Sequence, residues 1–331
     1  MKTGVWDIVG RGRTPSEDRS FMREVSGEIL IAGVLDGHSG SFTVECTVRK
    51  LPDALIALVK TIGTASEDAL RAGLRAVFIN HDKLLAKQGG LSYRDSGCTA
   101  TIVIITPKLC CFAYIGDSPA CIFNSDTGVI YGSIGKHEPS APTEKTRIEK
   151  NGGEVATDDG DAPRVNGCLM VSRAFGDFSM KFKDPNRPTE AELTANWATD
   201  FCVVAEPDIV IVPRPEKGIV AIFSDGLVET TTSTEYRSYR EIVDDICKTI
   251  KLESDLTRAA KICLSRQVAS FTDVPSEYDG DDITLLLINC DRPVVTAPII
   301  GNTAVASTRK NRSGHRRTRS SKKKLAKSFY I

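Results

Sequence analysis

Several acidic residues stand beside short apolar runs, an arrangement suited to holding a hard metal ion. Asp36 and Asp225 each follow such a run and precede a glycine. Asp281 precedes another run, and Glu17 lies near the N-terminus. Strand ends hold side chains rigidly, and Mg²⁺ and Mn²⁺ prefer oxygen ligands, so these residues are candidate ligands of a divalent cation. Each Asp-Gly pair taken alone more often marks a turn, so only the combination supports this interpretation.

The elements that must position these residues can be read from the apolar periodicity. Short runs bounded by glycine, proline and aspartate are typical of strands, and they are residues 29–35, 99–106, 111–115, 120–123, 209–212, 219–223 and 283–288. Helical patterns lie between them, with two within residues 41–88, a short one at 144–151 and another at 256–268. Because the helices are grouped and do not alternate with strands, we expect antiparallel sheets covered by helices. Residues 181–198 are polar and irregular, and should form an excursion beside the sheets.

The composition is that of an ordinary soluble protein. Of 331 residues, 41% are hydrophobic and 26% are charged. No apolar run approaches the roughly 18–20 residues that cross a bilayer, and the N-terminus lacks the apolar core of a signal peptide. The 10 cysteines include no C-x-x-C pair, which argues against structural zinc and favours free thiols in a reducing compartment. We therefore expect a cytoplasmic or nuclear protein, and a monomer.

The net charge of zero conceals a strong asymmetry along the chain. Residues 309–331 contain ten of the 43 basic residues and none of the 43 acidic ones, so the remainder has a net charge of about −10. The chain should divide into a folded domain over residues 1–292 and a basic, disordered tail over residues 293–331. Basic clusters of this kind bind import receptors, nucleic acids or anionic surfaces, or they simply keep a chain soluble. We favour nuclear import.

The order of motifs over residues 6–289 resembles that of the PPM-type (type 2C) serine/threonine protein phosphatases. The first motif is the R-x-x-x-E-D pattern that contains Arg13, and the second is the D-G-H-x-G pattern that contains Asp36 and His38. The eight matching segments are residues 13–18, 36–40, 97–100, 116–118, 164–177, 205–207, 224–226 and 281–284. So many ordered motifs do not recur by chance.

This resemblance implies an α+β fold and a two-metal site. The fold would be a four-layer α-β-β-α sandwich, with two antiparallel sheets flanked by helix pairs and with Mg²⁺ or Mn²⁺, two ions per site, at one end. Asp36 would bridge the ions, and the carbonyl of Gly37 would help to hold one of them. The remaining ligands implied by the resemblance are Glu17, Asp225 and Asp281.

The resemblance also implies the reaction, which is hydrolysis of phosphoserine and phosphothreonine in phosphorylated proteins by a metal-bridged hydroxide. Two cations neutralise the anionic ester and lower the pKa of a bound water, so no protein nucleophile is required. Arg13 would bind the substrate phosphate, and His38 would protonate the leaving oxygen. The non-catalytic alternatives are a turn-capping role for His38 and a surface position for Arg13. A cysteine phosphatase is not supported, because no cysteine is followed by arginine at the C-x₅-R spacing.

Three positions depart from the family's pattern. Lys136 stands where relatives usually have an aspartate that helps to bind a third metal, and its ammonium would repel a cation there. Asp282 replaces the usual asparagine, which makes the surroundings of Asp281 more negative. Pro119 replaces an arginine, and only a local effect is expected. Because the two-metal ligands are all present, an active enzyme is favoured, and the alternative is a catalytically weak phosphatase-like module that binds phosphoproteins.

Overall fold

The computed structural model describes residues 1–10, 16–62, 66–88, 94–157, 162–186, 188–228, 237–272, 278 and 280–292. All of these residues belong to one compact unit. Arg13 and the whole basic tail lie outside the described residues, so the roles expected of them remain predictions.

Two five-stranded sheets form the centre of this unit, and the strands of both are paired antiparallel. In spatial order, the first sheet contains β1 (Thr3–Ile8), β15 (Ile283–Asn289), β14 (Ile219–Phe223), β8 (Ala120–Phe123) and β9 (Ile130–Ser133). The second sheet contains β13 (Asp208–Pro213), β7 (Leu109–Ile115), β6 (Ala100–Ile105), β3 (Ile29–Leu35) and β2 (Arg19–Ser26). Short strands form a three-stranded sheet, β12 (Phe175–Gly176), β5 (Gly97–Cys98) and β4 (Gly37–His38), and a pair, β10 (Val155–Ala156) and β11 (Arg164–Val165).

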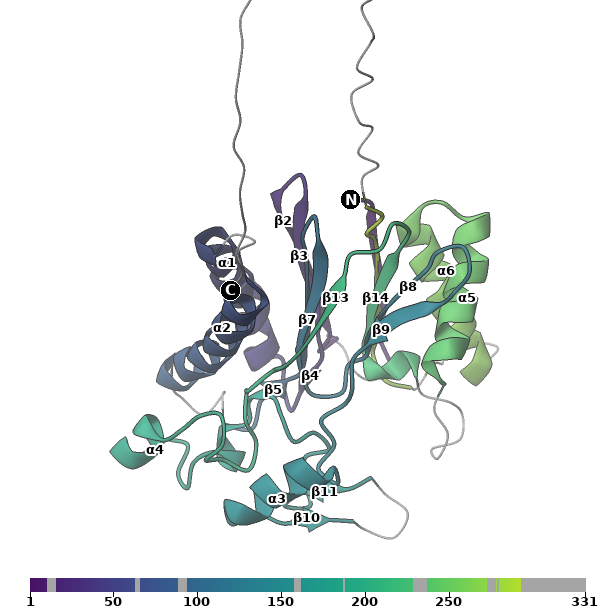
Figure 1. Cartoon of the computed structure of the whole chain (residues 1–331). Coiled ribbons are helices and arrows are strands. Elements are labelled where there is room, and N and C mark those ends of the chain that lie inside the picture. Colours follow the sequence, from purple (N-terminus) through teal and green to yellow (C-terminus); the bar gives the residue numbers. More distant parts are fainter. Residues whose placement is uncertain are drawn as a thin grey trace, which may run out of the picture. The chain divides into compact units, whose positions relative to one another are not determined.

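Helix pairs cover the outer faces of the two large sheets, which gives the four layers expected from the sequence (Figure 1). The helices α1 (Phe42–Ile62) and α2 (Glu67–Gln88) share a core with the second sheet, whereas α5 (Tyr239–Leu252) and α6 (Leu256–Phe271) share one with the first. A third core fills the space between the sheets. Within the described ranges, no helix is long and apolar enough to span a membrane.

The continuous apolar runs of the central strands follow from this layering. In β3, Ile31 and Leu35 face the core under α1 and α2, whereas Leu30, Ala32 and Val34 face the core between the sheets. Successive side chains of a strand point to opposite faces, so a strand that is covered on both sides must be apolar at every position.

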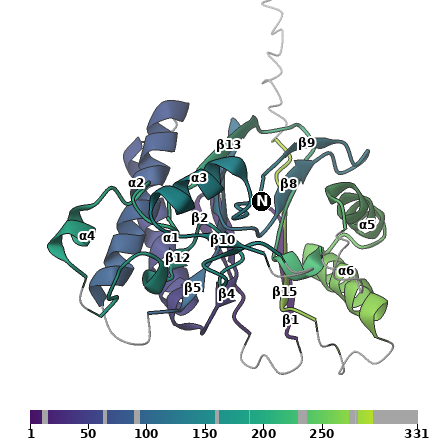
Figure 2. The same ribbon diagram turned by 90° about the horizontal axis from the view of Figure 1, so that it is seen from below.

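A smaller group of elements lies beyond the end of the sheets where β4 and β5 are found (Figures 1 and 2). We call this group the small lobe, and it comprises α3 (Pro142–Lys150), β10, β11 and residues 166–174. It has its own core, which includes Ile148, Val165 and Val171. The helix α4 (Glu190–Thr194) lies in the irregular excursion that the sequence predicted, and Phe182 and Trp197 anchor that excursion to the core under α1 and α2.

A buried histidine on α2 predicts a pH-dependent stability. His81 is 4% exposed, its Nε2 lies 3.0 Å from Thr47 Oγ1, and burial lowers its pKa to about 4. The unfolded chain therefore takes up a proton near pH 6.5 and the folded chain only near pH 4, so folding should lose stability as the pH falls between these values. The loss should total about 3 kcal/mol. Urea unfolding at pH 7 and pH 5 should show this dependence, and His81→Gln should weaken it; an equal dependence in the variant would contradict the assignment.

Candidate functional site

Each large sheet brings two strand ends to the same edge of the sandwich, and this explains why residues far apart in sequence meet. In the second sheet, Arg19 of β2 pairs with Leu35 of β3, so the start of β2 lies beside the end of β3. In the first sheet, Phe223 of β14 pairs with Leu285 of β15, so the end of β14 lies beside the start of β15. Acidic residues stand just outside all four of these strand ends.

The second sheet contributes Glu17, Asp36 and Gly37. The amide of Gly37 donates to the carbonyl of Glu17 at 3.2 Å, and Glu17 Oε1 accepts from the amide of Gly40 at 2.7 Å. A side chain on Gly37 would come within 2.7 Å of the Glu17 carbonyl oxygen, so only glycine allows the two segments to lie this close. The amide of Thr99 donates to the carbonyl of Asp36 at 2.8 Å and fixes the strand end.

The first sheet contributes Asp225 and Asp281, and a buried carboxylate joins the two sheets. Asp18, at the start of β2, accepts hydrogen bonds from Ser224 Oγ and Thr284 Oγ1 of the first sheet, both at 2.7 Å. Asp225 Oδ1 is buried and has no hydrogen-bond partner among the described residues. A buried acceptor without a partner is costly, so an oxygen of this kind marks a place for a ligand.

These strand ends line one cleft of about 740 Å³. Its floor is acidic and contains every predicted site residue that the structure describes, together with Asp117: the residues are Glu17, Asp36, Gly37, His38, Asp117, Asp225 and Asp281. Its opposite wall comes from the small lobe, with Arg164 and residues 168–171. None of the described residues between 181 and 198 lines the cleft, so it is the small lobe, and not that excursion, that faces the site.

The floor is short of positive charge. Burial, followed by the charges of Asp225 and Asp18, raises the pKa of Asp36 well above its ordinary value. Burial and Asp225 likewise raise the pKa of Asp117 to about 7, and burial raises that of Asp18 to about 7 against the hydrogen bonds from Ser224 and Thr284. Carboxylates that disfavour one another's ionisation in this way are stabilised by a bound cation.

The donor set fits divalent cations that are only partly enclosed by protein. Carboxylates, a glycine carbonyl and an unpartnered buried oxygen are hard ligands of the kind that Mg²⁺ and Mn²⁺ prefer. Within the described ranges, no three His, Cys, Asp or Glu side chains lie close enough together to hold a metal ion by themselves. An open arrangement is usual for Mg²⁺, which keeps several waters and binds through a few carboxylates together with substrate phosphate.

His38 lies at the cleft and is paired with Asp177, the last residue of the motif at 164–177. Its Nε2 is 2.9 Å from both Oδ1 and Oδ2 of Asp177. Burial acts to lower the pKa of His38, but Asp177 outweighs it and raises the pKa. A Cβ on Gly97 would collide with both partners, so this glycine makes room for the pair. The motifs that contain Gly97 and Asp177 were visible in the sequence, but their proximity to His38 was not.

The three departures from the family's pattern have distinct structural outcomes. Asp282 is 3% exposed and is not among the residues that line the cleft; its Oδ1 accepts from the amide of Gly10 and its Oδ2 from that of Glu17, both at 2.9 Å. It therefore fixes both flanks of the segment that contains Arg13. Lys136 lies near the cleft, where its charge acts to lower the pKa of Asp117. The carbonyl of Pro119 accepts from the amide of Phe223 at 3.0 Å, and the local effect expected of this residue stays a prediction.

Comparison with known proteins places this geometry in context. A family model described as protein phosphatase 2C matches residues 13–272. A probable protein phosphatase 1N of Homo sapiens is 32% identical over 202 residues, which are 60% of this chain and 42% of that protein. A probable protein phosphatase 2C 58 of Arabidopsis thaliana is 32% identical over 221 residues, or 66% of this chain and 75% of that one. The match to the human protein thus spans less than half of that relative's length.

Solved structures share the fold at low sequence identity. A crystal structure of a phosphatase from a pathogenic strain of Toxoplasma gondii superposes with a TM-score of 0.68 at 22% identity, covering 86% of this chain and 91% of that one. A serine-threonine phosphatase 2C from the same organism gives a TM-score of 0.62 at 18% identity, covering 87% and 94%.

Proposed function

Because the chain belongs to the protein phosphatase 2C family, we propose that it is a protein serine/threonine phosphatase that depends on Mg²⁺ or Mn²⁺. The observation that best supports this is the convergence of carboxylates from four separate strand ends on one cleft, with Asp225 Oδ1 left without a partner. Such a floor repels a phosphate ester unless cations are present, and so it suits a metal-dependent hydrolase.

The residues of the cleft have separable tasks in this proposal. Glu17, Asp36, Asp225 and Asp281, together with the carbonyl of Gly37, hold two divalent cations. When bound, the cations supply charge neutralisation of the phosphate and activation of a water for in-line attack. His38 gives a proton to the leaving serine or threonine oxygen, and Asp177 fixes its ring and supports its charged form. Arg13 binds the phosphate through its planar pair of donors.

Phosphate release from a phosphothreonine peptide tests the proposal. We expect turnover with Mn²⁺ or Mg²⁺ and none with EDTA, because the acidic floor cannot accept the phosphate unaided. Calorimetric titration of the folded protein with Mn²⁺ supplies a second readout that needs no turnover. Cation binding without turnover would favour a phosphoprotein-binding module, and the absence of both in a folded sample would refute the proposal.

A further inference from the structure

The two sides of the cleft differ in chemistry and in origin. The floor consists of acidic residues from the ends of the large sheets, whereas the wall combines the cationic Arg164 with residues 168–171 of the small lobe, and these four residues are neutral and largely apolar. Met170 on this wall is 38% exposed. We call residues 168–171 the cleft wall. A phosphate must reach the floor, and the polypeptide attached to it must then lie against the cleft wall.

The chain immediately after the cleft wall is held by Glu144 of α3. Ser172 Oγ donates to Glu144 Oε2 at 2.7 Å, and the amide of Ser172 donates to the carbonyl of His137 at 2.9 Å. The next residue, Arg173, places its Nη2 2.6 Å from Glu144 Oε1. Two consecutive residues at the base of the wall are therefore fixed by one carboxylate.

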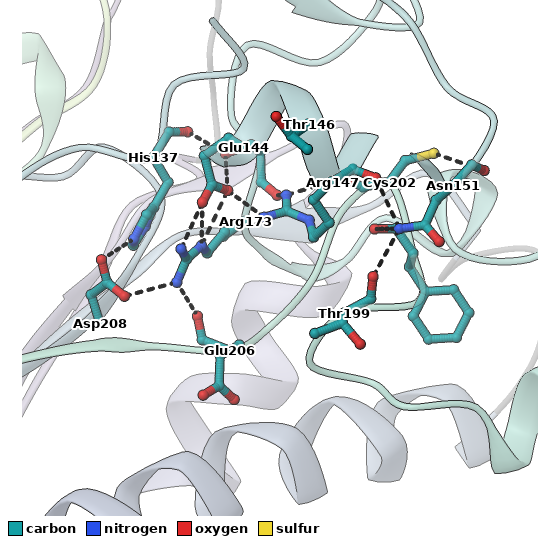
Figure 3. Close-up of polar contacts among 12 residues, drawn as sticks. His137, Glu144, Thr146, Arg147, Asn151, Arg173, Thr199, Cys202, Glu206 and Asp208 are labelled. Carbon is teal, nitrogen blue, oxygen red and sulfur yellow. Dashed lines mark hydrogen bonds and ion pairs between the residues drawn. The ribbon is translucent and has the colours of Figure 1, made fainter. Parts of the chain in front are cut away.

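Glu144 is a buried anion surrounded by cationic groups. Its side chain is 4% exposed and lies between Arg147 and Arg173, as Figure 3 shows. Burial acts to raise the pKa of Glu144, but Arg173 and Arg147 outweigh it and lower the pKa to about 2, which favours the charged carboxylate. Arg147 Nη2 also donates to the carbonyl of Ser172 at 2.7 Å, which adds a second link to the base of the wall.

The same cluster connects the small lobe to the second sheet. Arg173 Nη1 donates to the carbonyl of Glu206 at 2.9 Å and to Asp208 Oδ1 at 3.0 Å, and Asp208 begins β13 (Figure 3). Asp208 Oδ2 in turn lies 3.3 Å from His137 Nε2, and His137 Nδ1 accepts from the amide of Gly116, which precedes Asp117 of the floor. The base of the wall is thus tied to the start of β13 and, through His137, to Gly116.

We propose that Glu144 is a positioning residue that holds the cleft wall at the place where the polypeptide of the phosphorylated substrate lies. The inference rests on the proposed phosphatase function and extends it. The floor is assembled by the large sheets, so a small aryl phosphate needs only the floor. A phosphopeptide also needs the wall at a fixed distance from the floor, and that distance depends on Glu144.

Kinetics with two substrates test this assignment. Glu144→Gln keeps the shape of the side chain but removes the charge that fixes both arginines. We expect the KM for a phosphothreonine peptide to rise about tenfold, with hydrolysis of 4-nitrophenyl phosphate unchanged. Glu149→Gln is the matched control on the same helix, because Glu149 is 54% exposed and pairs with the exposed Lys145 at 3.8 Å. The control should leave the ratio of the two kcat/KM values as in the wild type.

A second variant covers the case in which Glu144→Gln does not fold. Met170→Ala changes an exposed side chain of the wall itself, and it should lower the phosphopeptide kcat/KM relative to that of the aryl phosphate. If a folded Glu144→Gln variant loses both activities equally, or if neither variant changes the ratio, the positioning role is wrong while the phosphatase function stands. If the wild-type protein hydrolyses neither substrate with Mn²⁺, the proposed function fails, and this inference fails with it.

Discussion

Replacement of Asp225 by alanine should lower cation-dependent phosphate release by about a thousandfold or more, which corresponds to several kcal/mol of lost transition-state stabilisation. Asp225 supplies the buried oxygen that has no protein partner, and its charge is the largest neighbouring contribution to the raised pKa of both Asp36 and Asp117. The measurement is Mn²⁺-dependent turnover of a phosphothreonine peptide, together with calorimetric titration of Mn²⁺.

The same substitution should not destabilise the fold in the presence of EDTA. Removing the charge of Asp225 relieves its repulsion of Asp36 and Asp117, so thermal unfolding without cation should occur at an equal or higher temperature. Asp126→Ala is a suitable control, because Asp126 lies in the turn between β8 and β9, is 57% exposed and pairs with Lys217. A folded Asp225→Ala protein that retains wild-type turnover would refute the metal assignment.

The largest effect on stability is expected at Asp82. This α2 residue is paired with Lys181, and their side chains are 1% and 0% exposed. Asp82 Oδ1 also accepts from the amide of Gly176 at 2.9 Å. Asp82→Ala would leave the buried ammonium of Lys181 without its counterion, with the carbonyl of Ala174 at 3.0 Å as its remaining acceptor among the described residues, and the amide of Gly176 without this acceptor. The free energy of unfolding should therefore fall by about 3–5 kcal/mol. Urea unfolding at pH 7 measures this loss.

A double variant distinguishes the stabilising attraction between Asp82 and Lys181 from the free-energy cost of removing both charges from water. Burial raises the pKa of Asp82, and Lys181 opposes that rise. Removing both charges from water carries a desolvation cost that a well-packed apolar pair avoids. Asp82→Leu combined with Lys181→Met should therefore recover much of the stability lost in Asp82→Ala. A double variant as unstable as the single one would show that the pair contributes net stability. Because Gly176 precedes Asp177, the partner of His38, turnover should fall even in the stable double variant.

The sequence predicted the fold wherever burial leaves a periodic signal. The expected strands at residues 29–35, 120–123 and 219–223 coincide with β3, β8 and β14, because apolar runs covered on both faces are unambiguous. The expected helix at 144–151 and the observed α3 differ by one or two residues at each end. The strands β1 and β2 were missed. Both lie at the edges of their sheets, where few of their side chains are buried, so their sequences lack a clear apolar pattern. The helix α5 was also missed, although its Ser238–Glu241 capping box was present in the sequence.

Site residues could be predicted where the reactive or ligand side chains lie within a single sequence motif. Four carboxylates of the floor and His38 were identified from residue type and from the resemblance, and the structure brings them to one cleft; Asp117 of the floor was not identified in this way. The contributions of Asp177, Glu144 and the cleft wall could not be predicted, because they depend on contacts between segments separated by up to 139 residues. Whether the small lobe or residues 181–198 faces the site is likewise a question of tertiary packing.

The position of Asp282 bears on how this family's loops can diverge. Its two carboxylate oxygens accept hydrogen bonds from the amides of Gly10 and Glu17, and so they hold the two residues that flank the segment with Arg13. An asparagine has a single acceptor oxygen and would turn an N–H toward one of those amides. The aspartate at position 282 is therefore matched to the two backbone amides that it binds. Where aspartate and asparagine exchange at position 282, the hydrogen bonds to Gly10 and Glu17 must change as well, so these two flanking residues and the start of β15 should evolve together.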